Sequence, residues 1–120
     1  MSKLLVHLTH GPEDPTRATL AFLVAKAAKE EGHDVTIFLV ANAVYLIKDS
    51  VIESVIGVGT GSLKEHFAFM LQNQIPIYLS GLSSKARGIT EADLQHKNAK
   101  FADPKTLVRL NLENDRMFTY

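Results

Sequence analysis

The segment Val35–Val40 constrains the fold most, because its sequence VTIFLV shows no alternation of apolar and polar residues. A strand this apolar is covered on both faces, which is typical of a parallel sheet. Lys3–Thr9 and Gln74–Leu79 are also mainly apolar and are predicted to be two further strands. Parallel strands need long crossover connections, so helices are expected between them.

The stretches between these strands contain helix signals. Asp14-Pro15 is typical of a helix start, since Asp caps free N–H groups and Pro fits the first helical position. Gly32 fits the exit from this helix. Ser62 and Glu65 match a capping box at the start of a second helix. The apolar residues at helical spacing are Leu20, Leu23, Val24 and Ala27 in the first helix and Phe67, Met70 and Leu71 in the second.

The remaining elements are shorter. We expect a short helix at Ala43–Ile47, a loosely structured connection at Asp49–Val58, a helical turn at Thr90–Leu94 and a short strand at Ala99–Phe101. The C-terminal part fits two patterns. Positions 108, 110 and 112 are apolar and alternate as in a strand, whereas the Asp-Pro pair at 103–104 is typical of a helix start. We predict a helix to about residue 114 and a final strand over Met117–Tyr120.

Alternating strands and helices predict a three-layer α/β/α sandwich with right-handed crossovers. At 120 residues we expect one domain, 1–120. Basic and acidic residues number 13 each, so no strongly basic face for nucleic acid is expected. No apolar run is long enough to span a bilayer and no signal peptide pattern is present. We therefore expect a cytoplasmic protein with no membrane partner.

The absence of cysteine excludes disulfides, thiolate metal ligands and thiol redox chemistry. The histidines lack the spacing of a metal site, so we expect no metal. Gly57–Ser62 superficially resembles a phosphate loop but lacks Gly-Lys-Ser/Thr, so no nucleotide cofactor is expected. We predict a flexible loop that closes over a neighbouring site or packs on another subunit.

Polar residues follow the first predicted strand. Thr9 and His10 lie at its carboxyl end, and Asp14 and Arg17 lie at the start of the next helix. A helix N-terminus favours an anion, and His10 is a candidate proton donor near neutral pH. The structural alternative is that Asp14 only caps the helix while His10 and Arg17 are solvated.

A second polar group begins where the third strand ends, at Ser80. Ser83, Ser84, Lys85 and Arg87 follow in a predicted polar turn. Ligand sites in open α/β sheets lie at such strand ends. The hydroxyls are candidate donors to a bound anion, with Lys85 or Arg87 supplying charge. The alternative is a tight turn whose serines bond the backbone.

The stretch Ile75–Ile89, with its Pro-Ile-Tyr strand and Ala-Arg-Gly segment, resembles the signature of the DsrE/DsrF-like family of small sulfur-relay proteins. The Thr-His-Gly turn, the Gly-rich loop and the closing strand also match in order and spacing. The resemblance implies a five-stranded, mostly parallel sheet. In many members a reactive cysteine stands where this chain has Ser80 or Ser83, so the chain is similar to a cysteine-free member of the family.

This resemblance implies a link to sulfur metabolism without a sulfur-carrying residue, because serine does not form a persulfide. We expect a binding protein for a small anion or thio-compound. The family also implies a homotrimer or hexamer, and a cysteine-bearing relay protein as partner. The apolar Val35–Ile47 segment is expected to supply interface surface. The expected ligand residues are Thr9, His10, Arg17, Ser80, Ser83, Ser84 and Arg87.

Two other functions stay open. One is a hydrolase or transferase in which His10 activates Ser80 or Ser83, which requires His10 within hydrogen-bond reach of a serine hydroxyl. The other is a non-catalytic oligomeric interaction module with no small ligand.

Overall fold

A five-stranded sheet forms the centre of the computed structural model, which describes all 120 residues. The strand order is β6-β5-β2-β1-β7, and all four neighbouring pairs are parallel. Its strands are β1 (Lys3–Leu8), β2 (Asp34–Leu39), β5 (Ile77–Ser80), β6 (Ala99–Ala102) and β7 (Arg116–Thr119). Because the strands are parallel, their carboxyl ends meet at one edge of the sheet.

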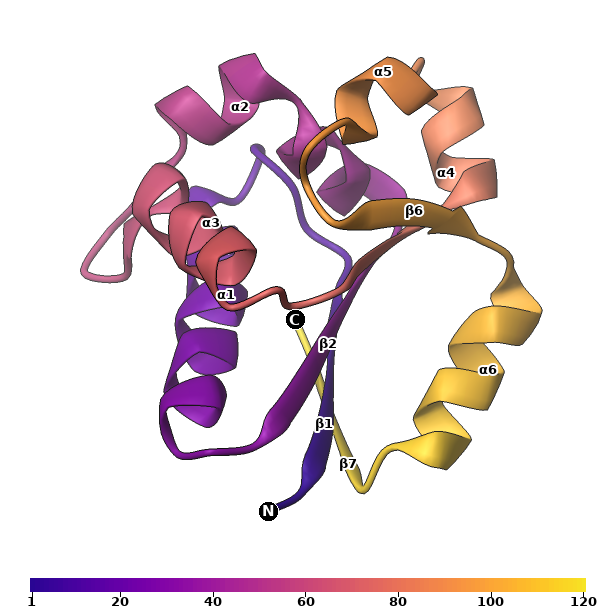
Figure 1. The fold of residues 1–120 in the computed structure, drawn as a ribbon. Coiled ribbons are helices and arrows are strands. Elements are labelled where there is room, and N and C mark those ends of the chain that lie inside the picture. Colours follow the sequence, from indigo (N-terminus) through magenta and orange to yellow (C-terminus); the bar gives the residue numbers. More distant parts are fainter.

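Helices cover both faces of this sheet. In Figure 1, α1 and α3 lie on one side and α6 on the other, while α2, α4 and α5 gather toward the carboxyl ends of the strands. The predicted three-layer α/β/α sandwich is therefore confirmed. The helices are α1 (Pro15–Glu30), the 3-10 helix η1 (Ala41–Ile47), α2 (Asp49–Ser54), α3 (Leu63–Gln72), α4 (Gly81–Ala86), α5 (Glu91–Leu94) and α6 (Pro104–Glu113).

The helix signals of the sequence operate as predicted. The side chain of Asp14 accepts a hydrogen bond from the Arg17 amide at the start of α1, and Asp103 accepts one from the Thr106 amide at the start of α6. Gly32 follows α1 with φ +89°, a left-handed conformation that glycine adopts without strain. The helical interpretation of the C-terminal part and the final strand are confirmed, with the strand at Arg116–Thr119.

The predicted loose connection at Asp49–Val58 is wrong. Residues 49–54 form α2, and β3 (Ile56–Gly57) pairs antiparallel with β4 (Gly61–Ser62) in a small hairpin. This hairpin packs on α1, because the Val58 amide donates to Thr16 Oγ1 and the hydroxyls of Thr19 and Thr60 are 2.6 Å apart. The predicted flexible glycine loop is thus a hairpin held against its own subunit, with Gly57 at a point where a Cβ would overlap both hydroxyls.

The polar turn predicted after Ser80 is also wrong, because residues 81–86 form α4. This helix has only six residues, and no apolar periodicity marks it in the sequence. Its start is fixed by Ser80, whose hydroxyl accepts a hydrogen bond from the Ser83 amide at 3.1 Å. The local cap, rather than a hydrophobic face, therefore defines this helix.

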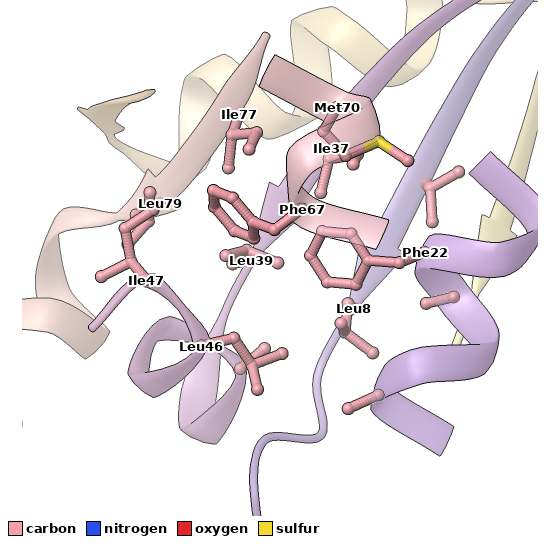
Figure 2. Packing of buried hydrophobic residues seen from close by; sticks show 14 of the residues in the cluster. Leu8, Phe22, Ile37, Leu39, Leu46, Ile47, Phe67, Met70, Ile77 and Leu79 are labelled. Carbon is pink, nitrogen blue, oxygen red and sulfur yellow. The ribbon is translucent and has the colours of Figure 1, made fainter. Parts of the chain in front are cut away.

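The hydrophobic core lies between the sheet and the α1/α3 layer. Figure 2 shows side chains of β1, β2, β5, α1, α3 and η1 meeting there, including Leu8, Phe22, Ile37 and Phe67. The apolar run after β2 belongs to this core: Ala43, Val44, Leu46 and Ile47 are each 0% exposed. The prediction that Val35–Ile47 supplies interface surface is therefore wrong, because folding of the single chain already buries it. No helix combines the length and the apolar character needed to cross a membrane.

Candidate functional site

Polar residues from four strand ends gather at the carboxyl edge of the sheet. Thr9 and His10 follow β1, Asn42 follows β2 within η1, Ser80 ends β5 and Tyr120 follows β7. These strands are sheet neighbours, so their ends lie side by side. The structure therefore brings these candidate residues to the carboxyl edge of the sheet, where the sequence predicted them to lie.

His10 lies in a chain of hydrogen bonds that fixes its tautomer. Arg17 Nη1 lies 3.2 Å from His10 Nε2, and because arginine only donates, Nε2 is the unprotonated acceptor. His10 Nδ1 lies 3.1 Å from Thr9 Oγ1, whose hydroxyl donates to the main-chain oxygen of Tyr120 at 2.9 Å. Nδ1 of the neutral imidazole therefore carries the proton and donates to Thr9. Protonation of Nε2 would break the bond to Arg17.

Arg17 and Asp14 combine a structural and an electrostatic role. Asp14 Oδ1 caps α1, as the structural interpretation predicted, and Asp14 Oδ2 lies 3.8 Å from Arg17 Nε. The side chain of Arg17 is 52% exposed. A half-exposed guanidinium held by His10 and Asp14 keeps N–H donors that face solvent.

Arg87 is held more firmly than Arg17. Its Nε donates to Asn42 Oδ1 at 3.0 Å and its Nη1 donates to the main-chain oxygen of Ser83 at 3.2 Å. The Ser83 hydroxyl in turn accepts a hydrogen bond from the Ala41 amide at 2.9 Å. The Arg87–Asn42 and Ala41–Ser83 bonds join α4 and its C-terminal cap to η1. Arg87 Nη2 makes no hydrogen bond to the protein. Asn42 is not among the site residues predicted from the sequence, although it is the one polar residue in the apolar run from Val40 to Ile47.

The two polar groups adjoin through a close backbone contact. A Cβ at Gly11 would overlap the main-chain oxygen of Asn42, so the loop after β1 presses against the start of η1. Gly11 is needed there because any side chain would separate the loops. We call Thr9, His10, Arg17, Asn42 and Arg87 the strand-end cluster.

The serine hydroxyls take a structural role. Ser80 caps α4 and Ser83 holds the Ala41 amide, as the alternative interpretation of this stretch predicted. The recorded hydrogen bonds of His10 go to Thr9 and Arg17, and none joins it to a serine. The geometry required for a histidine-activated serine is therefore absent from this arrangement.

Ser84 is separated from the other predicted ligand residues. Its hydroxyl is buried and has no protein partner, whereas the hydroxyls of Ser80 and Ser83 are both hydrogen-bonded. Among the predicted ligand residues, Ser84 alone lines one of the five cavities of the molecule. The strand-end cluster is thus a surface, not a deep pocket.

The structure contains no group of side chains suited to bind a metal ion. No set of three or more His, Cys, Asp or Glu side chains is placed to hold an ion.

The three groups with clearly shifted pKa values lie outside the strand-end cluster. Burial lowers the pKa of His7, while hydrogen bonds from the Thr90 amide and from Thr106 lower the pKa values of Asp93 and Asp103, respectively.

Comparison with known proteins extends over the whole chain. The sequence profile of the DsrE/DsrF-like family matches residues 2–120. An uncharacterized protein of Methanocaldococcus jannaschii is 31% identical over 122 aligned positions, covering 98% of this chain and 99% of that protein. The YchN protein of Escherichia coli superposes with a TM-score of 0.81 at 17% identity over 100% of both chains. A conserved protein of unknown function from Bacteroides thetaiotaomicron superposes with a TM-score of 0.71 at 15% identity, covering 99% of this chain and 95% of that one.

Proposed function

Because the chain belongs to the DsrE/DsrF-like family, which is linked to sulfur metabolism, we propose that it binds a small anion or thio-anion at the strand-end cluster. The chain has no cysteine, so on this proposal it holds the ligand without forming a persulfide of its own. Thiol chemistry would be supplied by a cysteine-bearing partner in the cytoplasm.

The observation that carries the proposal is the fixing of Arg87. Asn42 and the Ser83 carbonyl take the Nε and Nη1 donors and hold the guanidinium plane, while Nη2 has no recorded bond. Arginine at a fixed orientation is the preferred protein group for oxyanions, because its donors lie in one plane. Arg17 adds a second cation from the first turn of α1, which follows the loop whose Gly11 packs against Asn42.

The test is a titration with thiosulfate and with sulfate, followed by calorimetry. Arg87→Gln is expected to weaken binding about tenfold, since a hydrogen bond to a charged group contributes about 1.5–3 kcal/mol. Arg109→Gln is the matched control, because Arg109 lies on α6 and pairs only with Glu113 at 3.7 Å. Equal binding by wild type and Arg87→Gln would contradict the proposal.

Self-association is a second proposed property, supported by apolar side chains left exposed on α6 and β7. Val108 is 59% exposed, Leu112 80%, Met117 41% and Phe118 42%. We propose that copies of the chain meet through this surface, as a trimer or hexamer of the kind the family resemblance implies. An interaction module with no ligand would share this surface, so anion binding is what separates the two functions.

Native mass spectrometry tests the assembly. The wild type is expected to show a discrete oligomer, and Leu112→Glu is expected to shift it toward monomer because the new charge would be buried at the contact. Lys105→Glu on the same helix is a control for the added charge. A wild-type monomer at micromolar concentration would contradict this part of the proposal.

A further inference from the structure

Two adjoining cavities border α4. The outer one has a volume of about 530 Å³ and the inner one about 250 Å³. Gly81, Lys85 and Phe101 line both, so the two form one continuous cleft, which we call the α4 cleft. Its lining residues come mainly from α4, the carboxyl end of β6 and the start of α6, and Figure 1 shows where these elements lie. The outer part alone lies within the range of small-molecule sites.

Ser84 is one of the residues that line the inner cavity, and its hydroxyl has no partner in the chain. The residue is 1% exposed, and its Oγ is buried without a hydrogen bond to any protein atom. Nearly all buried hydroxyls in proteins are satisfied, so an orphan at a cavity wall needs a partner from outside the chain. The other serines near this helix, Ser80 and Ser83, both have protein partners.

The rest of the cleft combines apolar walls with one cation. Ile89 and Phe101 line the inner part, and Leu82, which is 70% exposed, borders the outer part. Lys85 is the cation of the lining, and no ion pair or side-chain hydrogen bond is recorded for its ammonium group. Both unused polar groups, the Ser84 hydroxyl and the Lys85 ammonium, are donors.

The acidic residue at the rim is already engaged. Asp103 Oδ1 accepts hydrogen bonds from the amide of Thr106 at 2.9 Å and from its hydroxyl at 2.8 Å, which caps α6. The negative charge of Asp103 therefore faces the positive end of the α6 dipole. The α6 dipole therefore offsets part of the negative charge of Asp103, which would otherwise repel a ligand anion near Lys85.

We propose that the α4 cleft binds a small organic carboxylate with an apolar body, with the carboxylate between Ser84 and Lys85 and the body against Phe101 and Ile89. The two donors match the oxygens of one carboxylate, and the walls match an aromatic or branched aliphatic group. This site is separate from the strand-end cluster, because no residue of that cluster lines either cavity. It extends the proposed function by a second ligand of different chemistry.

The test uses sodium benzoate as the probe and amide chemical shifts of the full chain as the readout. Benzoate is expected to cause saturable shifts at Gly81, Ser84, Lys85 and Phe101. Ser84→Ala is expected to raise the dissociation constant about tenfold through loss of a hydrogen bond to a charged group. Lys85→Met is expected to raise it about threefold, because the lysine is exposed to solvent.

Three controls make the outcome decisive. Ser84→Ala is expected to melt no lower than wild type, since it removes an unpaired buried hydroxyl. Lys64→Met removes an equivalent charge on α3 and is expected to leave benzoate affinity unchanged. Arg87→Gln is expected to weaken thiosulfate binding about tenfold and to leave benzoate affinity unchanged, so the two sites fail independently. Shifts that never saturate, or affinity unchanged in both Ser84→Ala and Lys85→Met, would overturn the site and leave only water in the cleft.

Discussion

The two faces of the central sheet differ in how completely one chain covers them. On the α1/α3 face, 22 buried residues form one cluster that includes side chains of β1, β2, β5, η1 and both helices. On the other face, α6 has no buried residue, and Val108 and Leu112 are largely exposed. The chain therefore builds a core on one side of its sheet and only partly closes the other.

The sheet face toward α6 carries a row of side chains that lie next to one another across the strands. His7, Phe38, Tyr78 and Lys100 are register neighbours across four strands. Phe38 and Tyr78 stack with ring centroids 6.0 Å apart, and Lys100 Nζ lies 5.0 Å from the Tyr78 centroid. This row stays fixed without a packed helix above its full length. Most of the buried core therefore lies on the α1/α3 face, while the α6 face leaves large apolar side chains exposed.

The sharpest test of this contrast pairs one aromatic with one aliphatic side chain. Phe67→Ala on α3 removes a residue that is 2% exposed and packs against Phe22, and we expect a loss of about 3–5 kcal/mol of unfolding free energy. Leu112→Ala on α6 removes an 80% exposed residue, and we expect a change within about 0.5 kcal/mol. Guanidinium melts of both variants measure the difference.

Protein concentration serves as the control in that experiment. The midpoint of Phe67→Ala should stay low at every concentration, whereas any effect of Leu112→Ala should grow with concentration if α6 is an interface. Equal losses for the two variants at low concentration would break the contrast between the faces.

Elements defined by local signals could be predicted from the sequence, whereas those held by non-local contacts could not. Local signals determine most elements: Asp14, Gly32 and Asp103 each act on the backbone within a few residues, and the buried strands are apolar throughout. The helix α4 was missed because its sequence GLSSKA has no apolar period. Its only local signal is the Ser80 cap, and a non-local contact between Ser83 and Ala41, which are 42 residues apart, ties it to η1.

For the candidate site, the sequence predicts only the edge of the sheet at which its residues lie. Parallel strands bring Thr9, His10 and Ser80 to one end of the sheet whatever the details. Whether each side chain faces a ligand depends on non-local bonds, such as that of Arg87 to Asn42, 45 residues away. The separation of Ser84 from Ser83 depends on the helical phase of α4, which a predicted turn does not define.

A buried lysine that joins η1, α5 and α2 provides the next largest expected effect. Lys97 is 8% exposed, and its Nζ donates to the carbonyl of Ile47 at 2.9 Å and that of Asp93 at 2.7 Å, and lies 2.7 Å from Asp49 Oδ1. Lys97→Met leaves two carbonyls without partners, and we expect a loss of about 2 kcal/mol.

Thermal unfolding of Lys97→Met beside Lys64→Met gives the measurement. Lys64 is 65% exposed and pairs with Glu53 at 3.2 Å, so its loss should change stability by about 0–1 kcal/mol. If Lys97→Met were no less stable than Lys64→Met, the buried bonds at η1 and α5 would not contribute to stability as argued.

The smallest expected effect tests the α6 face through pH. His7 Nε2 is buried without a partner, and burial lowers the pKa of His7 below its ordinary value of 6.5. The unfolded chain therefore binds a proton at a pH where folded His7 remains neutral. Stability is expected to fall as the pH drops below about 6.5 and to level off below the folded pKa.

His7→Phe removes this titration while keeping a ring beside Phe38, whose centroid lies 6.5 Å from that of His7. Urea melts from about pH 8 to about pH 5 should therefore show a flatter acid side for His7→Phe than for wild type. His96→Asn is the matched control, because His96 is exposed in a loop with φ 65°, which asparagine tolerates. If stability depended on pH in the same way in His7→Phe and wild type, water would reach His7 in the folded chain. The α6 face would then be more open, and its difference from the α1/α3 face larger, than the burial of His7 indicates.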